Sequence, residues 1–128
     1  MANILIIDDD ADIVEAMTIA LESRHHLVKK AASGDEGLAK CRTERPDLVI
    51  LDVMMETTDK GFDVARELKR DPAFKDVPIL MLTALKDKMG LDFNKEAGDS
   101  TWLPVDAYLE KPLKPEDLIL KVEQLLQR

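Results

Sequence analysis

Carboxylate, hydroxyl and ammonium side chains follow directly after short apolar stretches of this chain. Carboxylates held close together repel one another by roughly 4 kcal/mol per pair at an effective dielectric constant of 20, so they must take up protons or bind a cation. A site of oxygen ligands suits Mg²⁺, or Mn²⁺ in its place. The residues concerned are Asp8, Asp9 and Asp10 after the first stretch, Asp52 after the third, Thr83 after the fourth and Lys111 after the fifth.

Phosphoryl transfer is the chemistry that this set of groups favours. Beside a bound metal ion, Asp52 stays ionised and can attack phosphorus as a nucleophile, which forms an aspartyl-phosphate. The metal and the Lys111 ammonium would neutralise phosphoryl oxygens, and little other protein chemistry is needed.

The apolar stretches have the pattern of buried parallel strands. The runs ILII, LVIL and ILML are apolar at every position, which is typical of strands covered on both faces. The second and fifth runs are weaker, as expected at the edges of a sheet. We therefore expect an α/β fold with a doubly wound five-stranded parallel sheet, whose strand ends meet at one rim. The runs are 3–7, 27–32, 48–53, 78–82 and 106–109.

Helical patterns separate these runs. Asp10 is the N-cap candidate of the first predicted helix, and Ser33 and Glu36 form a capping box at the start of the second. Pro72 limits the length of the third helix, and Pro115 stands in the first turn of the last one. Residues 86–105 carry two glycines, a proline and no clear period, so we expect an irregular or shortened fourth helix there. The apolar faces are Ile13, Met17, Ala20 and Leu21; Phe62, Ala65 and Leu68; and Leu118, Val122, Leu125 and Leu126.

These motifs resemble the receiver domain of two-component response regulators over essentially the whole chain, residues 1–128. The resemblance implies the flavodoxin-like strand order 2-1-3-4-5. It also implies a phosphorelay protein, not an enzyme, that phosphorylates itself and loses the phosphoryl group slowly. Its implied site residues are Asp52 as phospho-acceptor; Asp8, Asp9, Asp52 and the Met54 main-chain carbonyl as Mg²⁺ ligands; Thr83, Ala84 and Lys111 as phosphoryl contacts; Tyr108 as an aromatic switch; and a cis peptide between Lys111 and Pro112.

Two stretches of the chain depart from the family pattern. The stretch MMETTDKG after Asp52 has no proline, and Glu56 adds a carboxylate there. Thr83 and Lys111 are 28 positions apart, several more than in a typical receiver, with the extra residues where the fourth helix belongs. Met54 and Leu85 are apolar at positions that tune hydrolysis in the family, so the resemblance implies slow loss of the phosphoryl group.

The same residues allow other interpretations. The acidic run could simply cap a helix, Tyr108 could be plain packing, and Trp102 could cover the sheet edge or dock a partner. A calcium loop fails because Ile13 and Ile19 stand where glycine and glutamate are needed. The residues after the first apolar run do not match the motif of a phosphatase with an aspartate nucleophile. They do not match the phosphate-binding loop of a flavin-binding module either. A degenerate receiver that acts as a phosphorylation-independent interaction module remains the alternative.

Composition limits the partners and the cellular compartment that we expect for this chain. A net charge of −8 argues against direct nucleic-acid binding, and no apolar run approaches the roughly 20 residues of a membrane span. The lone Cys41 and the absence of a secretory signal favour the cytoplasm. The expected partners are a sensor histidine kinase or histidine phosphotransfer protein and an unidentified downstream protein.

Overall fold

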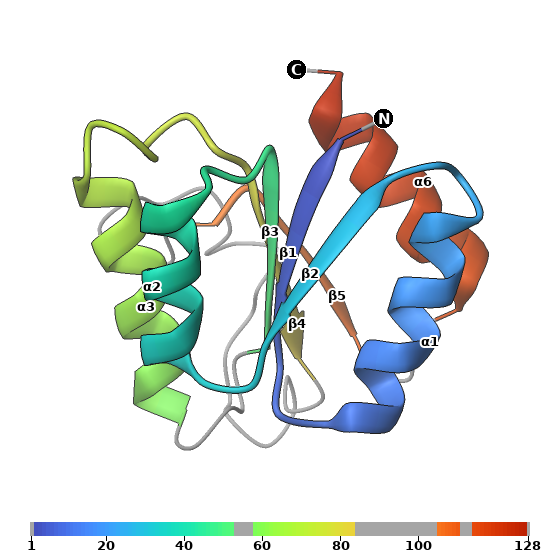
Figure 1. Ribbon diagram of the computed structural model, residues 1–128, viewed down its shortest axis with the longest axis horizontal. Coiled ribbons are helices and arrows are strands. Elements are labelled where there is room, and N and C mark those ends of the chain that lie inside the picture. Colours follow the sequence, from blue (N-terminus) through green and yellow to red (C-terminus); the bar gives the residue numbers. More distant parts are fainter. Residues whose placement is uncertain (1, 53–57, 84–104, 111–113, 128) are drawn as a thin grey trace.

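The fold is built on one five-stranded parallel sheet. The computed structural model describes residues 2–52, 58–83, 105–110 and 114–127. The strand order β2-β1-β3-β4-β5 confirms the predicted doubly wound topology and puts the two weaker apolar runs at the edges (Figure 1). The strands are β1 (Asn3–Ile7), β2 (Leu27–Ala31), β3 (Leu48–Asp52), β4 (Ile79–Thr83) and β5 (Ala107–Glu110).

Helices cover both faces of the sheet, so the three central strands are buried on both sides. Helices α1 and α6 lie on one face, and α2 and α3 lie on the other (Figure 1). In the described part of the chain no helix is both long and apolar enough to cross a membrane. The expected irregular fourth helix falls outside the described residues. The helices are α1 (Ala11–Glu22), α2 (Gly34–Thr43), α3 (Thr58–Arg70) and α6 (Pro115–Leu126).

Two helix N-termini are capped as the sequence predicts. The Asp10 carboxylate accepts hydrogen bonds from the backbone N–H groups of Asp12 and Ile13 at the start of α1. At α2, Ser33 Oγ accepts from the Glu36 N–H at 3.2 Å. The Glu36 carboxylate reaches back to the N–H of Ala32 rather than that of Ser33, so the predicted capping box is present but shifted by one residue.

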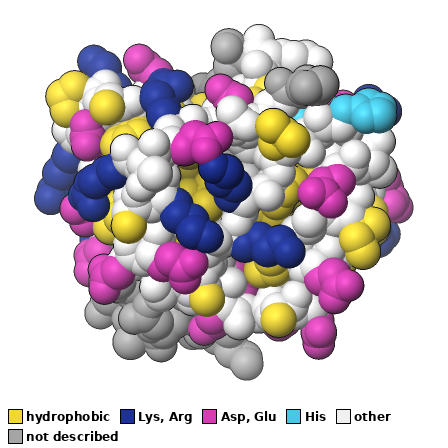
Figure 2. Space-filling view, viewed as in Figure 1, with side chains coloured by type: hydrophobic (Ala, Val, Ile, Leu, Met, Phe, Trp, Pro, Cys, Tyr) yellow, Lys and Arg dark blue, Asp and Glu magenta, His cyan; other side chains and the backbone are white. Residues whose placement is uncertain are grey.

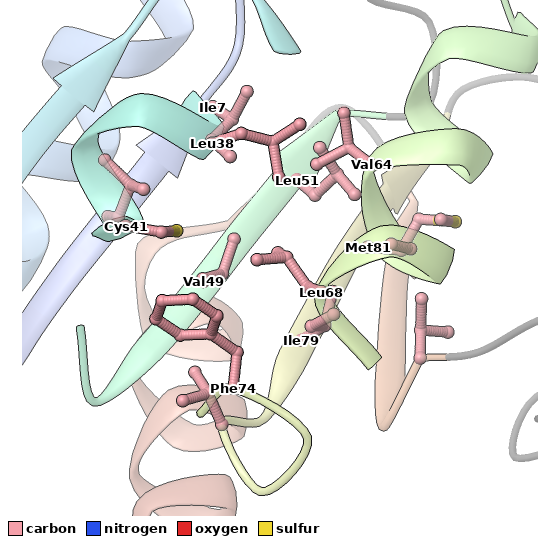
Figure 3. Packing of buried hydrophobic residues seen from close by; sticks show 14 of the residues in the cluster. Ile7, Leu38, Cys41, Val49, Leu51, Val64, Leu68, Phe74, Ile79 and Met81 are labelled. Carbon is pink, nitrogen blue, oxygen red and sulfur yellow. The ribbon is translucent and has the colours of Figure 1, made fainter. Parts of the chain in front are cut away.

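The core consists of two apolar layers, one on each face of the sheet. Side chains alternate along each strand, so Leu5 and Ile7 of β1 face α2 and α3, whereas Ile4 and Ile6 face α1 and α6. Figure 3 shows the first layer, where residues of α2 and α3 meet those of β1, β3 and β4. Because both layers are apolar, polar side chains are concentrated at the ends of the strands.

Strands β4 and β5 begin one residue later than the sequence predicts. Asp106 stands before β5 and binds the first residue of β4 twice, because its N–H donates to Ile79 O at 2.9 Å and its Oδ2 accepts the Ile79 N–H at 2.8 Å. Lys69 Nζ, at the end of α3, donates to the same Oδ2 at 2.9 Å. This contact fixes the register of the edge strand that leads toward Lys111.

Positive charge gathers at the edge strand β2, although the chain as a whole is acidic. Figure 2 shows lysine and arginine side chains over the middle of the face that β2 borders. Lys29 and Lys30 are exposed on the strand, and Lys40 Nζ of α2 donates to the main-chain oxygen of Lys30. Charged side chains on an edge strand oppose the addition of a further strand.

Candidate functional site

Three carboxylates converge at the rim where β1 and β3 end. One oxygen each from Asp8, Asp9 and Asp52 lies within 4.8 Å of the others. Asp8 and Asp52 are buried, each only 2% exposed, whereas Asp9 faces solvent. Among the described residues this is the only group of three or more histidine, cysteine or acidic side chains close enough to hold a metal ion.

The backbone after β1 explains why three consecutive aspartates have different environments. The Asp8 N–H donates to Ala31 O of the neighbouring strand at 3.0 Å, which extends the β1–β2 pairing by one residue. Its Oδ1 accepts the Asp10 N–H at 2.9 Å, so the chain turns sharply into α1. Asp10 is the N-cap of α1 and does not belong to the group of three carboxylates. For Asp10, this confirms the N-cap predicted from the sequence.

The register of the sheet brings the ends of four strands to the same level. Asp52 pairs with Leu82 in β4, so Thr83 follows one position beyond it. Thr83 in turn pairs with Glu110, the last residue of β5, and Lys111 comes next in the chain. The described ends of β1, β3, β4 and β5 therefore meet at one rim. The side chain of Thr83, and Met54, Ala84, Lys111 and Pro112 altogether, lie outside what the structure describes.

The donor set of this rim fits a hard divalent cation. Two carboxylates taken out of water and placed near a third are unfavourable unless positive charge compensates them. Oxygen-only ligands from few residues match Mg²⁺, which keeps several waters in its coordination shell. The exposed position of Asp9 leaves a route from solvent to the cluster.

Tyr108 is partly buried and packs against the apolar core. It pairs with Met81 across the sheet edge, is half-buried and packs against the apolar layer beneath α2 and α3. This is the packing interpretation weighed from the sequence. Its role as an aromatic switch stays a prediction.

Cys41 is buried in the apolar layer under α2. Its side chain is 1% exposed within the α2 layer, and burial raises the pKa of the thiol to about 11. The thiolate that would react with an oxidant or bind a metal is therefore scarce at neutral pH.

Sequence reasoning did not find two polar features of the opposite end of the sheet. One is the Lys69–Asp106 ion pair; Lys69 continues the apolar face of α3, which gave no sign of a charged contact. The other is His26, which is 7% exposed beside a cavity although its neighbour His25 is exposed. Only the tertiary contacts distinguish these two adjacent histidines.

Comparison with known proteins gives one consistent family. The family model described as "response regulator receiver domain" matches residues 4–123. The chain is 39% identical over 132 residues to the DNA-binding dual master transcriptional regulator RpaA of Synechocystis, and 36% identical over 128 residues to the transcriptional regulatory protein AfsQ1 of Streptomyces coelicolor. Each alignment covers 100% of this chain but only 50% and 52% of the relative, so the chain spans about half the length of these proteins.

Solved structures of similar length share the fold. A putative response regulator from Chloroflexus aurantiacus superposes with a TM-score of 0.85 at 33% identity, covering 99% of this chain and 98% of that one. The chemotaxis response regulator CheY4 of Vibrio cholerae gives a TM-score of 0.83 at 29% identity, covering 98% of each chain.

Proposed function

Because the chain belongs to the response regulator receiver domain family, we propose that it is a phosphorelay switch in which Asp52 accepts a phosphoryl group beside a bound Mg²⁺. Receiver domains are phospho-acceptors rather than enzymes that turn over a substrate. The observation that carries the proposal is the convergence of Asp8, Asp9 and Asp52 within 4.8 Å, with two of the three side chains buried.

The metal ligands would be Asp8, Asp9, Asp52 and the main-chain carbonyl of Met54. A bound Mg²⁺, or Mn²⁺, supplies positive charge for the carboxylates and for the oxygens of an incoming phosphoryl group. The hydrogen bond from the Asp10 N–H to Asp8 Oδ1 holds that carboxylate in a fixed orientation. The buried position of Asp52 limits the water that could compete with it as a nucleophile.

The transfer itself requires one bond to form and one to break. An oxygen of Asp52 bonds to phosphorus while the phosphorus–nitrogen bond of a donor phosphohistidine breaks, and the departing imidazole nitrogen takes up a proton from solvent. Lys111 would stabilise the charge that gathers on the phosphoryl oxygens. No general base is required, because the nucleophile is already ionised.

Phosphorylation would change the surface of the domain through the ends of β4 and β5. The added charge of about −1.5 to −2 would draw Thr83, the Ala84 main chain and Lys111 inward, and Tyr108 would repack in response. Shifting an active population from 1% to 99% requires roughly 5.5 kcal/mol of preferential stabilisation. A few charge-assisted hydrogen bonds supply part of this, so we expect a partial shift that a downstream protein completes.

The donor in this proposal is a sensor histidine kinase or a histidine phosphotransfer protein of the cytoplasm. The downstream target is a protein and not nucleic acid contacted directly, since the chain carries a net charge of −8. We propose residues 1–128 as a single receiver unit.

The test is phosphorylation by acetyl phosphate, followed by intact mass. With Mg²⁺ present, the wild-type protein should gain one phosphoryl group, and Asp52→Asn should gain none. Asp71→Asn is the matched control: it removes one carboxylate away from the rim but keeps the oxygen that accepts the Ala73 N–H. Phosphorylation of Asp52→Asn at the wild-type rate would contradict the assignment.

Two further measurements separate the metal site from the acceptor. Omitting Mg²⁺, or changing Asp8 to Asn, should slow phosphorylation strongly, while Asp52→Asn should leave some metal affinity in the Asp8–Asp9 pair. Once formed, the phospho-aspartate should decay slowly, as the apolar Met54 and Leu85 imply. If the wild-type protein binds Mg²⁺ but never gains phosphate, the phosphorylation-independent interaction module is favoured instead.

A further inference from the structure

A buried histidine joins the beginning and the end of the chain, at the end of the sheet opposite the three carboxylates. His26 is 7% exposed, whereas its neighbour His25 faces solvent. The His26 backbone N–H donates to Leu21 O at 3.3 Å, which ties the residue before β2 to the end of α1. Ala2 and the last turn of α6 both reach its ring, near the two chain ends marked in Figure 1.

One ring nitrogen holds the residue that precedes β1. His26 Nδ1 accepts the Ala2 N–H at 3.2 Å, and a nitrogen that accepts carries no proton, so this bond requires a neutral ring with its hydrogen on Nε2. Ala2 is also held through its carbonyl oxygen, which accepts the Leu27 N–H at 2.8 Å. A proton added to Nδ1 would set two N–H groups against each other. It would therefore abolish the first bond and leave the second.

The other ring nitrogen faces a carboxylate that stays ionised. His26 Nε2 lies 3.5 Å from Glu123 Oε2, and this contact becomes an ion pair when the ring is charged. Arg24 donates to both oxygens of Glu123, at 3.1 and 3.2 Å, and this hydrogen bonding holds the pKa of Glu123 below its usual value. Glu123 therefore keeps its charge over the range of about pH 5 to 8 in which histidine side chains gain a proton.

The remaining charged side chains at this end make no contact with the ring. Among the described residues, Glu123 alone forms an ion pair with His26. Arg45 and Asp47 are bound instead to main-chain groups, Arg45 to an oxygen before β4 and Asp47 to the first N–H of β1. The charged groups that surround this end of the sheet besides Glu123 are Arg24 after α1, Arg45 and Asp47 before β3, and Asp76 before β4.

We propose that His26 is a proton-dependent switch between these two contacts. The neutral ring holds Ala2 through Nδ1, whereas the charged ring releases the Ala2 N–H and pairs with Glu123. The proton comes from solvent, through the hollow that Ala2, His26 and Glu123 border, and only a hydrogen bond breaks. Mild acid thus loosens the segment before β1 and tightens α6 against the turn that follows α1. This device is separate from the proposed phosphoryl transfer, so either can fail without the other.

The test is an NMR titration of the ¹⁵N-labelled full chain from pH 8 to pH 5.5. Two-bond ¹H–¹⁵N spectra report which ring nitrogens carry protons, and the heteronuclear NOE of the Ala2 amide reports how firmly that residue is held. As His26 gains a proton on Nδ1, the Ala2 signal should shift with the same midpoint and its NOE should fall. His25 should titrate without any effect on Ala2. A His26 ring that stays neutral to pH 5.5, or one that gains a proton while Ala2 is unchanged, overturns the proposal.

A variant at His26 separates the ring from the terminal amine. His26→Gln carries no charge at any pH, so the Ala2 amide should lose its response to mild acid. The α-amino group of a protein chain also titrates, at about pH 8. A response of wild-type size in a folded His26→Gln protein would belong to that group and overturns the proposal.

A pair of variants in α6 tests the role of Glu123. Glu123→Gln removes the carboxylate beside Nε2 and leaves the Arg24 cation close to the ring, so the Ala2 response should move to lower pH by about half a unit or more. Glu116→Gln is the matched control, because it makes the same change of charge at an exposed position in the first turn of α6. It should leave the response in place. Identical responses in the two variants overturn the assignment of Glu123.

Discussion

At the scale of single residues, position in the backbone decides what identical side chains do. Asp8 continues the β1–β2 pairing and is buried, Asp9 points to solvent, and Asp10 caps α1. The acidic run is one motif in the sequence but serves as two metal-ligand candidates and one helix cap in the structure.

The crowding of carboxylates leads to a prediction for Asp8. Asp8→Asn removes one negative charge from the group and keeps an oxygen for the Asp10 N–H. Without divalent ions, the variant should be more stable than wild type by about 1 kcal/mol, because like-charge repulsion falls. Urea unfolding with and without Mg²⁺ measures this, and Mg²⁺ should stabilise the variant less than the wild type. A variant destabilised without metal would show that repulsion is already compensated; Asp71→Asn is the charge-matched control.

The buried thiol leads to a second prediction at this scale. Because burial raises the pKa of Cys41 to about 11, iodoacetamide at pH 8 should label it only when the protein unfolds. The raised pKa also means that the folded state holds its proton more tightly, so stability should fall as pH rises from about 9 toward 11. Labelling in urea at the same pH is the positive control. Rapid labelling of the native protein would contradict the buried position.

At the scale of elements, the approach of α2 to the sheet depends on one missing side chain. A Cβ at Gly37 would lie 2.4 Å from Ile7 Cδ1 and 2.7 Å from Ile7 Cγ1, which are fully buried on β1. Helix propensity would favour alanine there by about 1 kcal/mol, but the contact forbids it. The close packing of α2 supports β1, the strand that leads directly into Asp8.

A double-mutant cycle tests this contact. Gly37→Ala should destabilise the protein by about 1–3 kcal/mol, because overpacking exceeds the gain in helix propensity. In the Ile7→Ala background, which lacks Cδ1, Cγ1 and Cγ2, the same change should cost much less. Urea denaturation of the four proteins gives the coupling free energy between residues 37 and 7. Additive effects would show that α2 moves aside without strain.

The cap of α2 leads to a prediction about pH. The hydrogen bond from the Ala32 N–H, and then the one from Lys40, hold the pKa of Glu36 below its usual value of 4.5. The folded state therefore favours the ionised form, so the stabilisation is present at neutral pH and is lost as pH falls through the lowered value. The difference in the urea midpoint of unfolding between wild type and Glu36→Gln should vanish at low pH, where Glu36 is protonated in both the folded and the unfolded state. A difference that persists at pH 2 would assign the effect to packing.

At the scale of the whole molecule, one lysine joins segments that are distant in sequence. Lys69 Nζ donates to Lys75 O, Val77 O and Asp106 Oδ2, at distances from 2.9 to 3.3 Å. The end of α3, the loop before β4 and the start of β5 meet at this side chain. It thereby fixes the edge strand that follows the undescribed residues 84–104.

Removing that lysine should destabilise the whole fold. Lys69→Met removes the ammonium group that donates to the half-buried Asp106 carboxylate and should cost about 2–4 kcal/mol. Lys75→Met is the matched control, because Lys75 takes part through its main-chain oxygen only, and it should change stability little. Thermal unfolding distinguishes the two. Lys69→Met as stable as Lys75→Met would mean that the ion pair adds nothing to the net stability.

The sequence by itself determined the order of the elements and the identity of the three converging carboxylates, and its resemblance to receiver domains supplied the strand order. Runs such as ILII and LVIL have no alternative to burial on both faces, and crossover handedness then leaves one rim for Asp8 and Asp52. Local signals also fixed the caps at Asp10 and Ser33, because capping depends on neighbours in the chain.

Only the tertiary structure decided which polar residues away from that rim are buried. Lys69 meets Asp106 across 37 positions, and His26 differs from His25 because its ring faces Ala2 and Glu123. Such contacts depend on how distant segments pack, and no periodicity or spacing encodes them. Burial removes water from these groups, so their chemistry follows from neighbours that the sequence places far away.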